Sequence, residues 1–150
     1  MPTGTAAPDV QLIGLNNEAK VRLADFRGKI VFLEIWATWC GPCQEPLSNL
    51  QTLRQKHPDW KDRVEVITLS IDDELKQARD HLQKRGWTNT ISVWAGPGGW
   101  RSEPAKSFRV SGVPTAYVLN REGKVAWAGS PREILDIGTM LDGLLRSRSN

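Results

Sequence analysis

Residues 30–43 join an apolar run to a two-cysteine turn, and this stretch constrains the fold more than any other part of the chain. Residues 30–36 are apolar except at Glu34, which is typical of a central strand covered on both faces. Every third residue from Leu47 to Leu53 is a leucine, a spacing that fits one side of a helix. The sequence therefore predicts a strand, a Cys-Gly-Pro-Cys turn at residues 40–43, and a helix.

Two cysteines at this spacing suit thiol–disulfide exchange. A disulfide is attacked by a thiolate, and a free cysteine with a pKa of about 8.5 is only slightly ionised at neutral pH. The backbone N–H groups and the dipole at a helix N-terminus favour a negative sulfur. We expect Cys40 to attack, because the first cysteine of such a turn is the more exposed one. Cys43 would then attack the mixed disulfide and release the product.

Several motifs support a resemblance to a known family. Trp39-Cys40-Gly41-Pro42-Cys43 after an apolar strand resembles the active site of thioredoxin-fold proteins. The chain is similar to the TlpA/ResA-like thiol–disulfide oxidoreductases, which are related to the AhpC/TSA redoxins. Ala7-Pro8-Asp9-Val10, residues 23–29 and Gly112-Val113-Pro114-Thr115 match that family's pattern, and the likeness covers residues 7–146. The resemblance implies an α/β fold: a thioredoxin-like three-layer α/β/α sandwich whose central mixed sheet carries an N-terminal β-hairpin and a helix–strand insertion.

Periodicity and turn residues predict the other elements. Besides the central strand, the predicted strands are residues 10–13, 20–23, 64–71, 91–94, 115–119 and 124–128. The predicted helices are residues 44–56, 74–85 and 103–109, and a last helix that Ser130 caps and Pro131 opens. Strand 64–71 should run parallel to the first, because a helix separates the two. Asp72 and Asp73 are predicted to cap the helix that Gly86 ends.

Pro114 is the second anchor that the resemblance implies. In the resembled fold this proline follows a cis peptide bond and lies against the two cysteines. The residue before it, here Val113, offers its backbone to an extended substrate segment. An ordinary trans proline is the alternative, since only about one X–Pro bond in twenty is cis. We expect Trp39 to flank and shield Cys40; a surface aromatic that only fills space is the other interpretation.

Glu34 is the candidate acid–base residue. It lies six residues before the first cysteine, where thioredoxin has its buried acid. A carboxyl group in an apolar strand should have a raised pKa and could relay a proton to or from Cys43. A glutamate whose head reaches a polar edge is the alternative. The TlpA/ResA pattern places its acid three residues after the second cysteine, where this chain has Pro46, so neighbouring Glu45 is the runner-up. Thr68 replaces the lysine that accompanies the acid in thioredoxin.

Length and charge limit the remaining possibilities. A chain of 150 residues predicts a single domain, 1–150, with a loose lead-in at residues 1–7 and a frayed tail at 147–150. The formal charge of +3 gives no indication of nucleic acid binding. No segment is long and apolar enough to span a membrane, and no signal peptide is recognisable. The protein is therefore cytoplasmic, or it is a trimmed chain that works as a periplasmic or membrane-anchored protein, which the resemblance favours.

The leading functional hypothesis is a thiol–disulfide oxidoreductase that reduces disulfides of protein substrates. Cytochrome c maturation and general disulfide reduction are two such roles in the resembled family. We expect a monomer without a cofactor, recharged by an upstream thiol electron donor. One alternative is a peroxiredoxin-like thiol peroxidase, although that chemistry uses a Thr-x-x-Cys site. Another is a Cys-x-x-Cys metal-binding module, although zinc usually has four ligands and only His57 and His81 remain as further Cys or His side chains.

Overall fold

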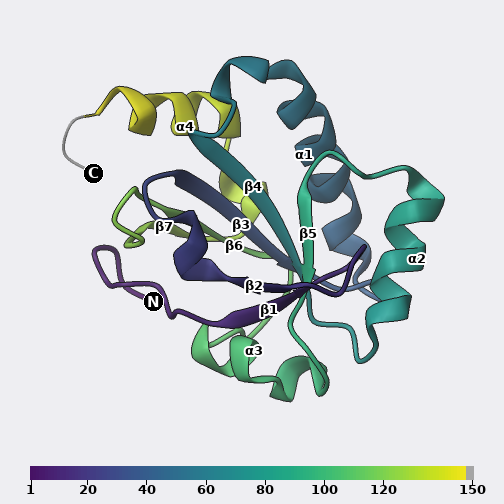
Figure 1. Cartoon of the computed structure of the whole chain (residues 1–150). Helices are drawn as coiled ribbons and strands as arrows, with labels where there is room; N and C mark the ends of the chain where they lie inside the picture. The colour runs from purple at the N-terminus through teal and green to yellow at the C-terminus, as the bar shows by residue number, and fades with distance from the viewer. Residues whose placement is uncertain (148–150) are drawn as a thin grey trace.

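One mixed sheet forms the centre of the molecule, with helices on both faces (Figure 1). The structure is a computed structural model of the chain and describes residues 1–147. Its strands are β1 (Gln11–Gly14), β2 (Lys20–Arg22), β3 (Ile30–Trp36), β4 (Val64–Ser70), β5 (Ile91–Trp94), β6 (Thr115–Leu119) and β7 (Val125–Gly129). Its α-helices are α1 (Gln44–Lys56), α2 (Leu75–Arg85), α3 (Glu103–Ser107) and α4 (Ile137–Arg146). Each predicted strand and helix is present, with shifts at the ends.

Strand β3 lies in the interior of the sheet, whose order is β2-β1-β5-β4-β3-β6-β7. All seven of its residues are buried, as the apolar run predicts. It pairs in parallel with β4 and antiparallel with β6, so the predicted parallel crossover through α1 is confirmed. The N-terminal hairpin of β1 and β2 extends the sheet antiparallel to β5.

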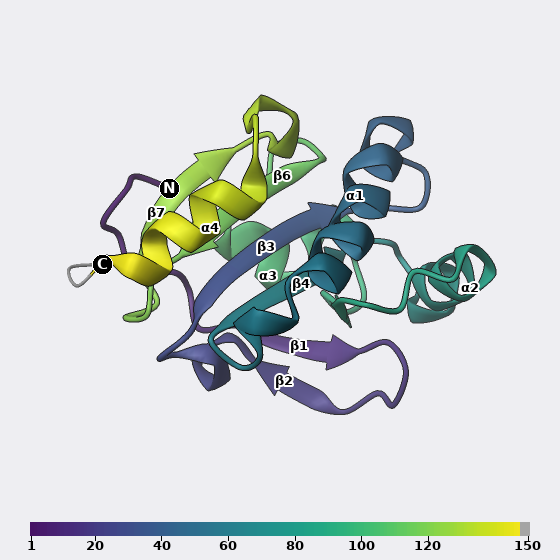
Figure 2. The same cartoon turned by 90° about the horizontal axis from the view of Figure 1, so that it is seen from above.

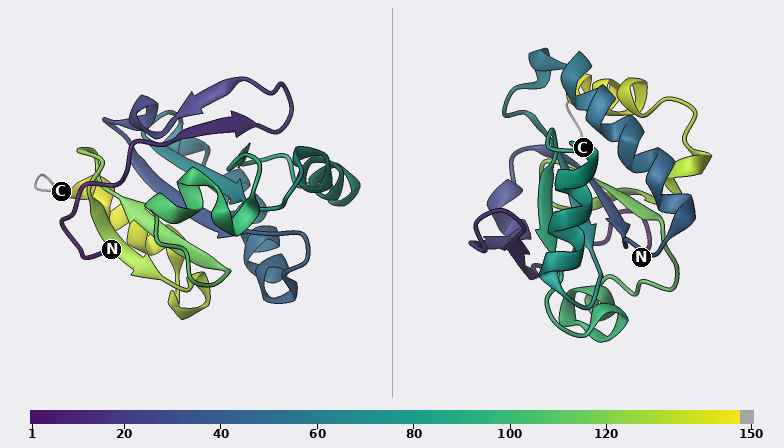
Figure 3. Two further views of the ribbon diagram at one scale, coloured as in Figure 1. Left: turned by 90° about the horizontal axis from the view of Figure 1, so that it is seen from below. Right: turned by 90° about the vertical axis from the view of Figure 1, so that its right-hand side faces the viewer.

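The helices make the outer two layers of the predicted three-layer fold. Helices α1 and α4 lie on one side of the sheet and α3 on the other (Figures 2 and 3). Successive β3 side chains point to opposite faces. Phe32 accordingly shares a buried cluster with Leu50 of α1 and Leu141 of α4, whereas Leu33 shares another with Phe108 beside α3. Apolar side chains on both faces of β3 therefore pack against both helical layers. The thioredoxin-like α/β/α arrangement is confirmed.

The predicted cap of α2 is wrong. Glu74 is the N-cap, and its backbone N–H donates to the Gln77 side chain at 3.0 Å. Asp72 is fully buried and accepts hydrogen bonds elsewhere. The predicted end of the helix is confirmed, since Gly86 has the left-handed conformation, with φ of 69°, that glycine adopts most easily.

The last helix begins later than predicted. The capping box between Ser130 and Glu133 is present, but it closes a separate 3-10 turn at Pro131–Glu133. Ile134 is extended and interrupts the helix, and α4 starts at Ile137 after Asp136 accepts the Thr139 N–H. The box supplies the right hydrogen bonds for one turn, but nothing in it requires the helix to continue.

The N-terminal residues are tied to the β6–β7 hairpin, unlike the loose lead-in expected for residues 1–7. Ala6 forms a bridge with Lys124, and the Ala7 N–H donates to the Gly123 carbonyl at 2.9 Å. These bonds give the segment fixed partners. The predicted frayed tail at 147–150 lies outside the described residues except for Ser147. Among residues 1–147, no helix combines the length and apolar character that a membrane crossing requires.

Candidate active site

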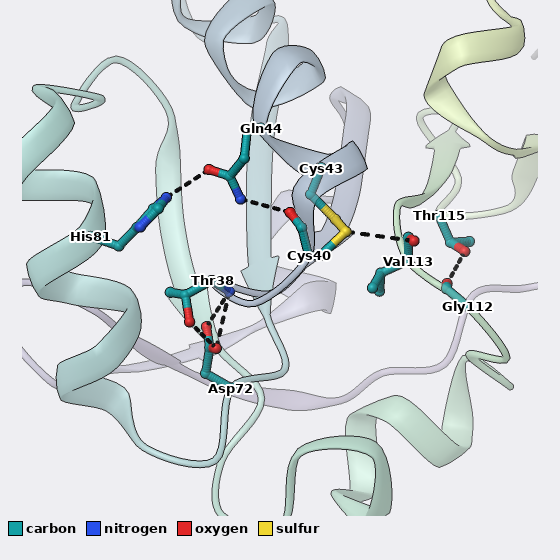
Figure 4. The surroundings of a disulfide bond; sticks show 9 residues. All are labelled: Thr38, Cys40, Cys43, Gln44, Asp72, His81, Gly112, Val113 and Thr115. Carbon is teal, nitrogen blue, oxygen red and sulfur yellow. Dashed lines mark hydrogen bonds between the residues drawn. A yellow bond between two sulfur atoms is a disulfide. The ribbon is translucent and has the colours of Figure 1, made fainter.

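Cys40 and Cys43 form a disulfide at the carboxyl end of β3 (Figure 4). Cys40 is extended, residues 41–43 make one 3-10 turn, and α1 follows from Gln44. Pro42 fits this first turn because its missing N–H has no acceptor there. Cys40 is 5% exposed and Cys43 is 0% exposed, so the first sulfur is the more accessible of the two, in the order that the sequence predicts.

The Val113–Pro114 loop lies against the disulfide. The peptide bond between these residues is cis, as the resemblance implies. The Cys40 Sγ lies 3.6 Å from the Val113 carbonyl oxygen (Figure 4). In the disulfide this sulfur has no hydrogen to donate, whereas a Cys40 thiol would have one. The loop is held in turn by Thr115, whose hydroxyl donates to the Gly112 carbonyl. The sequence-predicted cysteines and proline motif thus meet at one place.

A buried carboxylate that sequence reasoning assigned to a helix cap braces the active-site turn. Asp72, just after β4, accepts hydrogen bonds from the Thr38 N–H at 3.0 Å and the Thr38 hydroxyl at 2.7 Å (Figure 4). The Ser70 hydroxyl donates to it at 2.6 Å. Thr38 stands two residues before Cys40, so Asp72 fixes the approach to the disulfide. The only signal in the sequence is a carboxylate at the end of the strand next to β3.

Gln44 and His81 hold the other side of the turn. The Gln44 amide donates to the Cys40 carbonyl at 2.8 Å, and its oxygen lies 2.7 Å from His81 Nε2 on α2. That oxygen can only accept, so the ring must carry a hydrogen on Nε2 to complete the chain of bonds. Arg85 Nε lies 3.0 Å from the same nitrogen and can only donate. His81 Nε2 therefore cannot accept from Arg85 while it carries the hydrogen that it donates to Gln44. Burial and the Arg85 charge lower the pKa of His81.

Glu34 is 0% exposed, so the alternative of a glutamate that reaches a polar edge is wrong. Within residues 1–147, neither of its carboxyl oxygens has a hydrogen-bond partner. Burial raises the pKa of Glu34 to about 8. Thr68 and Ala116 flank it in register on the neighbouring strands, and the Thr68 hydroxyl bonds to Ser92 instead. Glu45 is exposed in the first turn of α1.

Trp39 is 56% exposed beside the first cysteine, and its ring lies 5.9 Å from that of Trp100. On another side of the turn, a groove of about 690 Å³ is lined by Pro42, Val113 and Pro114 together with residues of the β6–β7 region. An extended segment placed there would run past the residue whose carbonyl contacts Cys40. An exposed aromatic ring and a groove therefore border the turn.

A Cys-x-x-Cys disulfide between β3 and α1 of a thioredoxin-like fold, with a cis-proline loop against it, defines a thiol–disulfide oxidoreductase. The family model described as thioredoxin-like matches residues 28–125, well over half of the chain, and the protein belongs to this family. It is 29% identical over 126 residues to the thiol-disulfide oxidoreductase ResA of Bacillus thuringiensis subsp. konkukian, covering 83% of this chain and 68% of that one.

Solved structures agree with this assignment. A candidate thiol:disulfide interchange protein DsbE from Chlorobium tepidum is 25% identical, with a TM-score of 0.72 over 87% of this chain and 86% of that one. A thiol-disulfide oxidoreductase from Bacteroides fragilis shares the fold, with 22% identity and a TM-score of 0.78 over 93% of this chain and 99% of that one.

The donor set does not favour a metal clip at the cysteines. Among residues 1–147, the one group of at least three potential metal ligands is His57, Asp59 and Asp142, and it includes neither cysteine. A structural zinc usually takes four ligands. The cysteines are instead bonded to each other, in the arrangement that thiol–disulfide exchange requires.

Proposed function

We propose that the protein reduces disulfides of polypeptide substrates outside the cytoplasm, with Cys40 as the attacking and Cys43 as the resolving residue. The observation that carries this proposal is the Cys40–Cys43 disulfide against the Val113 carbonyl. Membership of the family implies protein thiol substrates, and the resemblance to TlpA/ResA-like proteins supports the extracytoplasmic location. Cytochrome c maturation is one substrate route, and the protein acts as a monomer that needs no cofactor.

The reaction is a two-electron exchange between two sulfur pairs. The reduced Cys40 thiolate attacks one sulfur of the substrate disulfide, forms a mixed disulfide and expels the other sulfur as a thiolate. Cys43, as a thiolate, then attacks the Cys40 sulfur and releases the second substrate sulfur. The substrate gains two electrons and ends as a dithiol, while the protein ends as the disulfide. An upstream dithiol donor reverses the same steps and returns the electrons.

Substrate binding is assigned to three residues at the turn. Val113 offers its carbonyl and N–H groups to an extended substrate strand, and Pro114 removes an N–H from beside the sulfurs. Trp39 contributes the exposed ring that flanks the mixed disulfide. The 3.6 Å contact between the Cys40 Sγ and the Val113 carbonyl oxygen supports the roles of Val113 and Pro114.

Glu34 is assigned the proton transfer that accompanies the resolving step. Resolution requires Cys43 to lose a proton. The pKa of about 8 leaves part of Glu34 ionised near neutral pH, and this carboxylate form can accept a proton. Two observations support this role: Glu34 lies on the strand that leads into the turn, and its carboxyl group has no hydrogen-bond partner among residues 1–147. The runner-up, Glu45, is exposed to water, unlike the fully buried Glu34.

The test uses both single-cysteine variants in an insulin reduction assay. Cys40→Ser should abolish reduction and form no mixed disulfide, whereas Cys43→Ser should accumulate one, because the resolving thiol is missing. Covalent capture by Cys43→Ser, followed by mass spectrometry, also identifies the physiological partner. Faster alkylation of Cys43 than of Cys40 in the reduced protein would reverse the assignment. Rapid turnover of hydrogen peroxide with a thiol donor would favour the peroxidase alternative.

A further inference from the structure

The groove beside the cis-proline loop is lined by two positively charged side chains. It begins at Pro42, Val113 and Pro114, where it adjoins the disulfide, and continues along the β6–β7 region. Its lining includes Arg109 and Arg132 and, among residues 1–147, no aspartate or glutamate.

Arg109 and Arg132 come from separate elements that meet at this groove. Arg109 follows α3, and Arg132 lies in the 3-10 turn Pro131–Glu133 after β7. Both are exposed, and neither side chain has an ion pair or hydrogen bond in the part of the chain that the structure describes. By contrast, the Arg22 side chain is paired with Asp9 at 2.6 Å.

Three acids stand near Arg132, and none of them lines the groove. Glu45 and Asp136 line a separate pocket that Arg132 also borders, and Glu133 follows Arg132 in the same turn. Its carboxylate is engaged within the turn, where it accepts the Ser130 N–H at 3.0 Å. The two guanidinium groups therefore remain available to a bound molecule, and each offers a planar set of donors that fits a carboxylate.

We infer that this groove selects polypeptide substrates with acidic residues beside the reactive cysteine, through Arg109 and Arg132. The inference rests on the proposed function, because it needs a substrate strand aligned on Val113. Such a strand enters the groove directly from Cys40, and its side chains alternate in direction. Acidic side chains on the groove side would then meet the arginines, whereas lysine side chains would be repelled.

The expected preference is moderate, because exposed ion pairs are individually weak. Two such pairs should raise kcat/KM for an acidic peptide by about threefold to tenfold over a neutral one. The preference should decline from low to high salt, since salt screens ion pairs between exposed charges.

The experiment compares three disulfide-linked peptides that differ only at the residues flanking the cysteine: aspartate, asparagine or lysine. Each rate is divided by the rate of reduction of the same peptide by dithiothreitol, because a flanking charge also changes the intrinsic reactivity of the disulfide. Wild type should prefer the aspartate peptide, and Arg109→Ala/Arg132→Ala should reduce all three at nearly equal normalised rates. The matched control Lys20→Ala/Arg146→Ala removes the same charge from exposed positions outside the groove lining and should keep the preference.

A second readout separates this inference from the proposed function. Reduction of a small uncharged disulfide should be equal in wild type and both double variants, since it needs only the cysteines. Equal normalised rates for the three peptides in wild type, or a preference that survives in Arg109→Ala/Arg132→Ala, would overturn the groove assignment alone. Failure of wild type to reduce any of the disulfides would instead overturn the proposed function.

Discussion

Replacing Glu34 by glutamine should remove a pH dependence of stability that the buried carboxyl group creates. Burial raises the pKa of Glu34 from 4.5 to about 8 in the folded, oxidised protein. Below pH 4.5 the group is protonated in both the folded and the unfolded state. As the pH rises toward 8, the unfolded chain releases this proton and the folded protein retains it. The free energy of unfolding must therefore fall through this window and level off above it.

The size of the effect follows from the width of the window. A difference of one pKa unit corresponds to about 1.4 kcal/mol, so the shift of Glu34 predicts a loss of about 5 kcal/mol between pH 4.5 and 8. This is a large part of the stability of a typical domain, which is about 5–15 kcal/mol. Glutamine keeps the shape of the side chain but has no proton to release, so its stability lacks this component.

Urea unfolding of the oxidised proteins, at intervals from about pH 4 to 9, measures the effect. The gap in the free energy of unfolding between Glu34→Gln and wild type should change by about 5 kcal/mol in favour of glutamine as the pH rises. Only the change with pH is the test, because replacing the buried carboxyl group by an amide also changes stability by an amount that does not depend on pH. Glu45→Gln removes an exposed carboxyl group and should follow wild type throughout. Parallel pH curves for wild type and Glu34→Gln would refute the reasoning.

Two further predictions concern the supports of the turn. Asp72→Ala should lower the free energy of unfolding by about 3 kcal/mol or more, because the Thr38 N–H and two hydroxyls lose a buried acceptor, and urea unfolding measures this. A loss below about 1 kcal/mol would mean that water replaces the carboxylate. Pro114→Ala should lower kcat/KM for a disulfide-linked peptide at least tenfold more than for a small disulfide reagent, since only the peptide uses the Val113 backbone; equal losses would contradict that role.

The sequence predicts the centre of the fold well because the decisive signals there are local and redundant. The apolar run of β3, the cysteine turn and the leucine spacing of α1 each indicate the same strand–turn–helix unit. The final helix was less predictable. The box of Ser130 and Glu133 supplies the same hydrogen bonds to a single 3-10 turn as to an α-helix. Whether the helix continues is decided downstream, where Ile134 becomes extended.

The supports of the site could not be read from the sequence because they join distant segments. Asp72 and Thr38 are 34 positions apart, and Gln44 and His81 are 37 apart. A carboxylate followed by a helix satisfies a capping pattern, so the local interpretation is reasonable until the neighbouring strand is placed. Arg109 and Arg132 likewise share a groove only because the end of α3 and the turn after β7 come together.

The two fully buried acids of this region, Glu34 and Asp72, have opposite surroundings, and the difference indicates how each is used. Asp72 accepts from an N–H and two hydroxyls, so its carboxylate is held by the fold and its loss should first appear as lost stability. Glu34 has no such donors among residues 1–147. A fold that left a carboxyl group there for stability alone would gain more from an apolar residue. An acid that costs stability when it ionises is consistent with the proton transfer near neutral pH that is proposed for Glu34.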